Sequence, residues 1–150
     1  MIHSMVEVDI TEARKTLREL KKKEYASITG YIIHCVSRAV EENKRVHAYR
    51  NLRSQLIEFD EVDVSTTMER MVDGRNEVVA MIIRSANKKS VQEISREIEE
   101  ERKNRVNDAE VYKFIRFYLA IPAFLRTWIF RIMDRSPHLM KKKSGTIMVT

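Results

Sequence analysis

The stretch Ile82-Ile-Arg-Ser-Ala-Asn-Lys-Lys-Ser-Val-Gln-Glu-Ile-Ser-Arg-Glu-Ile98 decides the fold of this chain. It begins with the end of an apolar run that is typical of a strand. Ser90-Val-Gln-Glu93 then has the pattern of a capping box, in which the Ser hydroxyl and the Glu carboxylate each satisfy a free backbone amide. Val91, Ile94 and Ile98 share one face of the helix that follows. The pattern therefore predicts a strand that leads almost directly into an amphipathic helix ending near residue 105.

Further strands are predicted upstream of this stretch. Apolar and polar residues alternate over 61–69, and Asp73-Gly74 is a turn signal, so 61–69 and 77–84 should form a hairpin or two neighbouring strands. Gln55–Phe59 is a shorter candidate. Met5-Val-Glu-Val-Asp-Ile10 also alternates, which predicts a half-buried strand at the beginning of the fold.

Two helices are predicted between the first strand and the others. Thr11 can cap a helix from Glu12 that places Ala13, Leu17 and Leu20 on one face. The next helix should begin near Ser27 or Thr29, with an apolar face made of Ile28, Ile32, Cys35, Val36, Ala39 and Val40. On that face Cys35 is expected to be a buried structural thiol and not a nucleophile. The order of elements predicts the α+β class.

All of the excess positive charge of the chain lies in its last 40 residues. Residues 1–110 hold 20 Lys/Arg against 21 Asp/Glu, whereas residues 111–150 hold 8 Lys/Arg against Asp134 alone. Seven of the eleven aromatic residues also lie in 111–150. Because the rest of the chain is neutral and no base-reading motif is present, nucleic acid is not expected as a partner. His3 and His47 have no second ligand at metal spacing, so no metal site is expected.

Residues 111–135 have the composition of amphipathic helices. The longest uncharged run, Phe117–Leu125, has nine residues, too few for the ~20 that span a bilayer. Pro122 should divide the segment into two short helices, and in the second one Thr127, Arg131 and either Asp134 or Arg135 share a polar face. Such helices can pack on the protein's own sheet, cover a subunit interface, or lie at an anionic membrane surface. The sequence favours packing, because aromatic stripes are more often core than anchor.

The 82–98 stretch resembles the acyltransferase core of 2-oxo acid dehydrogenase complexes. In that family a Pro-Val-Ile-Arg-Asn-Ala-like strand end leads into a Lys-Ser-Leu-like helix. Met5–Thr11, Thr29–Val40 and Glu61–Thr66 are similar to the family's first strand, next helix and Asp-Glu-Val-Asn-Ile-like strand. The resemblance implies a chloramphenicol acetyltransferase-like mixed sheet with packed helices. Residues 1–150 would be an incomplete catalytic domain, truncated at its C-terminus, with a basic aromatic helical insert at about 106–143.

Ser144-Gly-Thr-Ile-Met-Val-Thr150 resembles the family's Gly-Gly-Thr-Phe-Thr-Ile-Ser/Thr segment. In this register Thr150 matches the hydroxyl that hydrogen-bonds the oxyanion of the tetrahedral intermediate. A plain strand threonine is the alternative. The family's general base is the His of a His-x-x-x-Asp-Gly motif, but His3, His34, His47 and His138 are each followed four residues later by a residue other than Asp. The chain as given is therefore expected to be inactive.

The resemblance also implies the substrates and partners. Family members transfer an acyl group between a lipoyl-domain thioester and coenzyme A, at a site between the subunits of a trimer. No residue is assigned to coenzyme A binding. A cytoplasmic location is expected from the single cysteine and the absence of a signal-peptide pattern, with membrane association through 111–135 as an addition. The alternative function is non-catalytic: an assembly or membrane-surface protein derived from the same fold.

Overall fold

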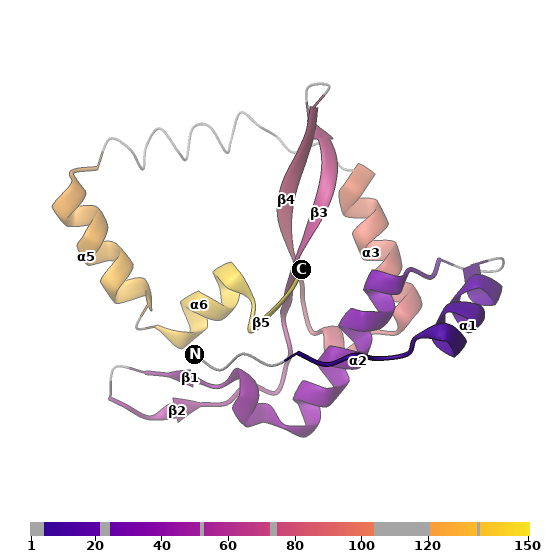
Figure 1. The fold of residues 1–150 in the computed structure, drawn as a ribbon. Helices are drawn as coiled ribbons and strands as arrows, with labels where there is room; N and C mark the ends of the chain where they lie inside the picture. The colour runs from indigo at the N-terminus through magenta and orange to yellow at the C-terminus, as the bar shows by residue number, and fades with distance from the viewer. Residues whose placement is uncertain (1–4, 22–24, 52, 73–74, 104–120, 135) are drawn as a thin grey trace.

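The computed structural model describes residues 5–21, 25–51, 53–72, 75–103, 121–134 and 136–150. The helices and strands over these residues are arranged as Figure 1 shows. In chain order they are α1 (Thr11–Lys21), α2 (Ile28–Glu42), the 3-10 helix η1 (Lys44–His47), β1 (Tyr49–Arg50), β2 (Leu56–Ile57), β3 (Val64–Val72), β4 (Arg75–Ile83), the 3-10 helix η2 (Ala86–Lys88), α3 (Val91–Lys103), α5 (Ala123–Asp134), α6 (Pro137–Ser144) and β5 (Ile147–Val149). The predicted α+β class is confirmed.

The long hairpin of β3 and β4 is the central element of the fold. The two strands pair antiparallel, from Val64 opposite Ile83 to Val72 opposite Arg75. β5 lies parallel to β3 on its other side, so the strand order is β4-β3-β5. The predicted strand is confirmed, and Val62, Val64, Thr66 and Met68 are buried as the alternation predicted. Their polar neighbours Asp63 and Ser65 are buried too, so burial does not alternate at the start of β3. The predicted Asp73-Gly74 turn lies outside the described residues.

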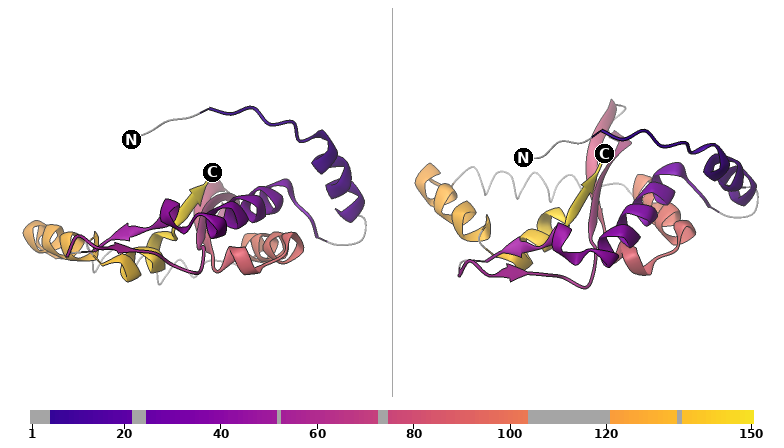
Figure 2. Two further views of the ribbon diagram at one scale, coloured as in Figure 1. Left: turned by 90° about the horizontal axis from the view of Figure 1, so that it is seen from below. Right: turned by 60° about the horizontal axis from the view of Figure 1, so that its bottom comes forward.

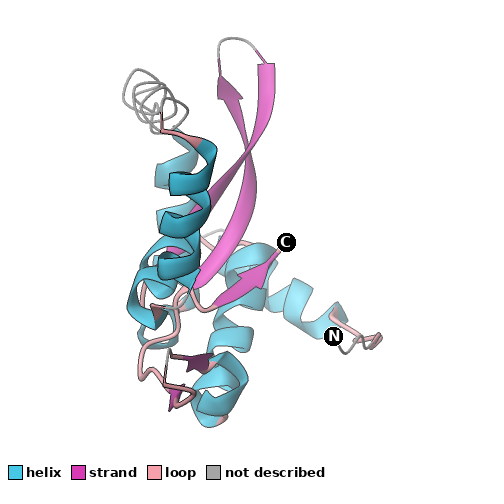
Figure 3. Cartoon of the chain, turned by 90° about the vertical axis from the view of Figure 1, so that its left-hand side faces the viewer, coloured by secondary structure: helices cyan, strands magenta, loops and turns pink. Residues whose placement is uncertain are grey.

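Helix α2 packs against α3 and η2, and α3 packs against both strands of the hairpin. Figure 3 shows how the two long strands of the hairpin twist about each other. The apolar side chains of the helices form one core with the hairpin, made of Ile33, Val40, Val62, Val64, Met68, Met81, Ile83, Ala86, Ile94 and Ile98. Ile33, Ile83 and Ile94 have no exposed surface. Full burial of one such side chain contributes about 1.5–3 kcal/mol. The core therefore fixes how the end of β4 enters α3.

The predicted start of α3 is confirmed in detail. The amide of Glu93 donates to the Ser90 hydroxyl at 3.2 Å, and the amide of Ser90 donates to the Glu93 carboxylate at 2.7 Å. This reciprocal pair is the capping box. Ile94 and Ile98, which the spacing placed on the inner face, are both buried.

The predicted inner face of α2 is wrong by about a third of a turn, at 100° per residue. Its buried residues are Gly30, Ile33, Ser37 and Val40, so of the predicted face only Val40 is buried, while Ile28, Ile32 and Cys35 are exposed. The reason is the close approach of α3: a Cβ on Gly30 would lie 2.3 Å from the Ser95 hydroxyl oxygen. Gly30 therefore faces α3, Ile33 and Val40 enter the core, and Ile28 and Ile32 face outward. The prediction that Cys35 is buried is therefore also wrong.

The predicted strand at Met5–Ile10 is wrong as well. Residues 5–10 form no strand and pair with no described residue, and Met5 is 97% exposed. Alternating apolar and polar residues give a strand one apolar and one polar face. A strand also needs the edge of a neighbouring strand to satisfy its backbone hydrogen bonds. Helix α1 is present as predicted, with Leu17 buried. Thr11 is its first residue and not its cap, because the Asp9 carboxylate accepts from the amide of Thr11 at 2.8 Å. Figure 2 shows that this N-terminal part stands apart from the sheet.

The region of the predicted 106–143 insert is helical where the structure describes it. Pro122 directly precedes α5, as expected of a residue that ends one helix and begins another, but the first predicted helix lies outside the described residues. The basic helix α6, which the sequence did not indicate separately, leads from α5 into β5. None of the described helices is long and apolar enough to cross a bilayer.

Candidate functional site

The site is built where β5 joins the edge of β3. Val64, Ser65 and Thr66 of β3 face Ile147, Met148 and Val149 of β5 in the parallel register. Thr150, the predicted oxyanion hydroxyl, directly follows β5 and is exposed. The position of Thr150 is therefore set by whatever holds β5 against β3.

Gly145 makes the entry into β5 sterically feasible. Its φ of 70° lies in the left-handed region, and a Cβ there would be 2.7 Å from the carbonyl oxygen of Asp63. Because no side chain intervenes, Thr146 comes close enough for its amide to donate to that carbonyl oxygen at 2.6 Å. The Tyr49 hydroxyl donates to the Gly145 carbonyl at 3.0 Å from the other side.

Asp63 stands at the centre of this junction, directly before β3. Its side chain is only 4% exposed, and each carboxylate oxygen has a separate partner. Oδ1 accepts from the amide of Ser85 at 2.9 Å, and Oδ2 accepts from Nη1 of Arg84 at 2.9 Å. Its backbone amide donates to the Thr146 hydroxyl at 3.2 Å. One residue thus connects the end of β4 to the beginning of β5.

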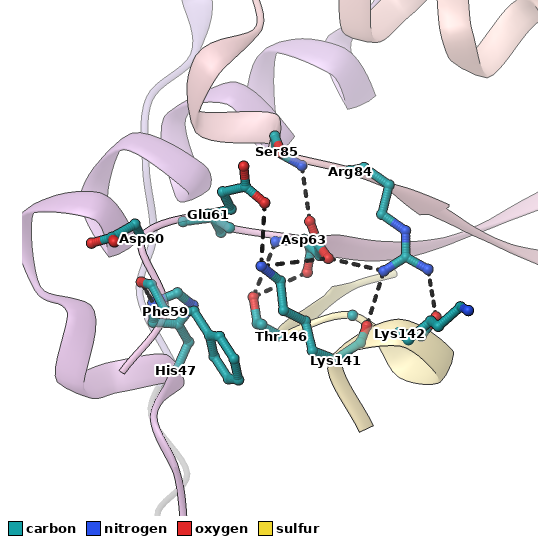
Figure 4. Close-up of polar contacts among 12 residues, drawn as sticks. His47, Phe59, Asp60, Glu61, Asp63, Arg84, Ser85, Lys141, Lys142 and Thr146 are labelled. Carbon is teal, nitrogen blue, oxygen red and sulfur yellow. Dashed lines mark hydrogen bonds and ion pairs between the residues drawn. The ribbon is translucent and has the colours of Figure 1, made fainter. Parts of the chain in front are cut away.

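Arg84 extends the connection to α6, as Figure 4 shows. Its guanidinium donates to the carbonyl of Lys141 at 3.0 Å and also to that of Lys142. These carbonyls belong to the last turn of α6, where the Lys141 carbonyl oxygen also accepts from the amide of Gly145 at 3.0 Å. A cation at this end of the helix is favoured by the helix dipole. Lys141 in turn lies 4.0 Å from Oδ2 of Asp63 and 3.5 Å from Oε2 of Glu61. We call Asp63, Arg84, Lys141 and Thr146 the Asp63 cluster.

Ser85 has a left-handed backbone conformation, with φ 49° and ψ 42°. Asn tolerates this conformation better than Ser does. The family sequence that residues 82–87 resemble has Asn at this position. The turn at Ser85 points its amide at Asp63 and brings Ala86 back to the carbonyl of Val62 at 2.8 Å.

A second, apolar group of side chains adjoins the Asp63 cluster. The Phe59 ring contacts His47, Tyr49 and His138 edge-on, and the Lys141 ammonium lies 5.0 Å from its centre. His47 is 3% exposed, with Nε2 3.1 Å from the carbonyl of Phe59 and Nδ1 without a partner among the described residues. Burial lowers the pKa of His47 below 6.5, and the positive charge of Lys141 lowers that pKa further.

Ion pairs with lysines lower the pKa of two carboxyl groups at the rim of the site. The hydrogen bond from Lys88, together with the charge of that lysine, lowers the pKa of Glu61. The hydrogen bond from Lys44 does the same to the pKa of Asp60. Both carboxyls are therefore ionised over the neutral pH range. No group of three or more potential metal ligands occurs among the described residues.

Sequence reasoning missed the Asp63 cluster. Arg84 and Asp63 both lie in segments that resemble the family, but nothing in a single sequence pairs them with each other or with Thr146. Thr150 lies at the end of the strand that these residues hold. The rings of His47 and His138 both contact the Phe59 ring. His34, which lies on α2, has its Nδ1 3.0 Å from the carbonyl oxygen of Lys89. His3 lies outside the described residues.

Known proteins provide an independent comparison. A truncated catalytic core of the 2-oxoacid dehydrogenase multienzyme complex from Thermoplasma acidophilum has a similar structure, with 23% sequence identity and a TM-score of 0.52. The similarity covers 67% of this chain and 49% of that core, so this chain spans about half the length of the core. At this identity the likeness shows the fold. No curated protein matches the chain.

The family model of the 2-oxoacid dehydrogenase acyltransferase catalytic domain matches residues 1–111. That range includes Asp63, the β3–β4 hairpin and the turn from Arg84 into α3. β5 and Thr150 lie beyond it. Because the match covers well over half of the 150 residues, the chain belongs to the acyltransferase (catalytic domain) family of the 2-oxoacid dehydrogenases.

Proposed function

We propose that this chain supplies the scaffold and one oxyanion hydrogen bond of an acyltransferase. The acyl group moves between a thioester, carried by a lipoyl domain or another donor, and the thiol of coenzyme A. The observation that carries the proposal is the attachment of β5 to β3, which leaves the Thr150 hydroxyl exposed directly after an ordered strand.

The chemistry requires a fixed donor at that place. Attack of a thiolate on a thioester carbonyl places negative charge on the carbonyl oxygen, and a positioned hydroxyl that donates to this oxygen stabilises the transition state by ~3 kcal/mol. The stabilisation depends on a donor held in place before the reaction. In this chain β5 provides the position, and the hydrogen bonds of Thr146 and Arg84 hold β5 and α6.

The proton must be removed from the thiol by a base that these 150 residues do not supply. None of the four histidines belongs to a His-x-x-x-Asp-Gly motif. We therefore propose that the 150 residues alone do not transfer acyl groups, and that the base comes from a polypeptide segment outside them, at a site between the subunits of a trimer.

The test is acetyl transfer from acetyl-coenzyme A to dihydrolipoamide, followed by chromatography as formation of S-acetyldihydrolipoamide and free coenzyme A. The chain alone should match the uncatalysed rate. Joined to a segment that carries the family's His-x-x-x-Asp-Gly motif, it should acquire activity. In that form Thr150→Ala should lower kcat by about 10²–10³-fold, since a single oxyanion donor has this effect. Thr150→Ser should retain most of the activity.

Thr29→Ala is the matched control, because Thr29 is an exposed threonine on α2. It should leave kcat unchanged. Transfer by the unmodified chain well above the uncatalysed rate would contradict the assignment of the base to another segment. If the joined form is active and Thr150→Ala leaves its kcat unchanged, Thr150 has no part in the mechanism.

The second candidate function is non-catalytic and rests on a different part of the molecule. Helix α5 has exposed aromatic side chains at Phe124 and Trp128 and contacts α6. These side chains do not contribute to the core of the described fold. An assembly or membrane-surface role would use them.

A further inference from the structure

Helix α5 lies at the periphery of the molecule. All the views in Figures 1 and 2 place it at one end, with α6 between it and the sheet. Phe124 is 73% exposed and Trp128 is 67% exposed, and Leu125 is also exposed. Packing of these side chains on the protein's own sheet, which the sequence favoured, is therefore not what the structure shows.

Arg131 of α5 lies beside the exposed aromatic side chains of this helix. Phe124, Trp128 and Arg131 are spaced i, i+4 and i+7, so they share one side of the helix. Arg131 is exposed. The polar residues were expected to lie opposite the aromatic ones, but the spacing places Arg131 next to Trp128.

The charge around α5 has a single sign. Residues 121–144, which cover α5 and α6, contain six Lys/Arg and one acid: Arg126, Arg131, Arg135, Lys141, Lys142 and Lys143 against Asp134. A complementary partner must carry negative charge and must also accept aromatic side chains. The interface of an anionic lipid bilayer does both, because indole and phenyl rings enter the headgroup boundary while arginines contact the phosphates.

We propose that α5 binds to the surface of an anionic membrane, parallel to its plane, with Trp128 and Phe124 inserted at the headgroup boundary and Arg131 at the lipid phosphates. A second copy of the chain fits less well, because two α5–α6 surfaces would bring positive charge against positive charge. The binding is independent of acyl transfer, so either activity can fail without the other.

Trp128 is the only tryptophan of the chain and reports its own insertion. With vesicles of phosphatidylcholine plus phosphatidylserine, the intact protein should sediment with the lipid and its Trp emission should shift to the blue. Lipids brominated near the headgroup should quench that emission more than lipids brominated at the chain end. Vesicles of phosphatidylcholine alone should give weak binding, and salt should reverse binding to the anionic vesicles.

Two variants test the apolar contact. Phe124→Gln keeps the tryptophan reporter and should weaken binding about tenfold, because an aromatic side chain leaves the interface. Val46→Gln is the matched control: Val46 is 72% exposed and follows the basic residues Lys44 and Arg45, but it lies in η1. It should bind like the unmodified protein.

A second pair tests the charge. Arg131→Glu should weaken binding at least tenfold, because each basic residue near the surface contributes about a factor of five. Arg53→Glu makes the same change in net charge at an exposed position between β1 and β2, and should have a much smaller effect. All four variants replace exposed residues, so their circular dichroism should match that of the unmodified protein.

Two outcomes would overturn the proposal. The first is sedimentation with anionic vesicles without a Trp128 shift and without a loss in Phe124→Gln, because this indicates only general attraction of a basic protein. The second is a concentration-dependent dimer that Phe124→Gln disrupts, together with no vesicle binding, because this assigns the surface to a second copy of the chain.

Discussion

Asp63 has hydrogen-bond partners in two other parts of the chain. Its carboxylate accepts from the amide of Ser85 and the guanidinium of Arg84, and its backbone carbonyl oxygen accepts from the amide and the hydroxyl of Thr146. Removal of one partner from a buried, hydrogen-bonded charge leaves the others unsatisfied, which costs more than the net contribution of the pair. Asp63 is therefore a residue at which small chemical changes should have large effects.

Asp63→Asn is expected to lower the free energy of unfolding by about 2–3 kcal/mol, because the amide cannot accept from both Ser85 and Arg84. Urea unfolding followed by circular dichroism measures the loss. Asp60→Asn is the control, since Asp60 pairs with Lys44 at the surface, and it should remain close to the unmodified protein. Equal stabilities of the two variants would contradict the importance given to Asp63.

His47 should make stability depend on pH. Its folded-state pKa lies below 6.5, so between that pKa and 6.5 the unfolded chain binds more protons than the folded one. The stabilisation is complete above pH 6.5 and is lost as the pH falls towards the lower folded pKa.

Unfolding midpoints measured from pH 7.5 to 5.5 should therefore decrease, and His47→Gln should flatten the decrease. His138→Gln, a change of the exposed histidine next to Phe59, should retain it. A slope that His47→Gln leaves unchanged would show that another group carries the dependence.

At the scale of elements, the contact between α2 and α3 depends on the missing side chain of Gly30. The Ser95 hydroxyl lies where a Cβ of residue 30 would be, and it also bonds the amide of Ser27 at 3.0 Å. Alanine inside a helix gives about 1 kcal/mol more stability than glycine does. At position 30 this added stability is opposed by a steric overlap with Ser95.

Gly30→Ala should therefore destabilise the protein by about 1–3 kcal/mol. In the Ser95→Ala background the same change should be less harmful by about 1 kcal/mol or more, because the overlapping oxygen is absent. Thermal unfolding of the four proteins in this cycle gives the coupling. Additive effects of the two changes would contradict the contact.

The sequence predicted elements well and their partners poorly. Three elements are determined by residues only a few positions apart, and all three are confirmed: the capping box of α3, the β3–β4 hairpin and α1. The inner face of α2 is not determined in this way, because the helix has two apolar stripes and the choice between them is made by Ser95 on another helix. Residues 5–10 alternate as a strand does, but alternation carries no information about the edge that would pair with them.

The same limit applies to the site. Arg84 and the Ser144–Thr150 segment could be recognised from the family's pattern, and the role of Thr150 stays a prediction. The bonds between Asp63 and Thr146 join residues 83 positions apart, and no local pattern encodes such a pair. The burial of His47 could not be predicted, because it depends on contact with Phe59 and therefore on tertiary packing.

The molecule consists of a core whose residues are buried and paired on several sides, and of peripheral helices that have few buried residues. Thr66 of β3 pairs with Met81 of β4 and with Val149 of β5 and is buried, whereas α1 has Leu17 as its buried residue and α5 contacts α6. Local opening free energies follow such differences in burial and pairing.

Hydrogen exchange followed by NMR or mass spectrometry should show this division. Amides around Thr66 should exchange through global unfolding, at rates set by the full stability of the protein. Amides of α1 and α5 should exchange several orders of magnitude faster, through local fraying. Protection of α1 equal to that of β3 would contradict the peripheral place that the structure gives it.

The parallel contact between β3 and β5 also sets an order of events during folding. The hairpin joins neighbours along the chain, whereas the contact of Asp63 with Thr146 closes a loop of 83 residues and must overcome its entropy. The hairpin and the two helices beside it can therefore assemble first, and β5 is added to an existing edge. Weakening the late contact between β3 and β5 should raise the unfolding rate and leave the folding rate almost unchanged.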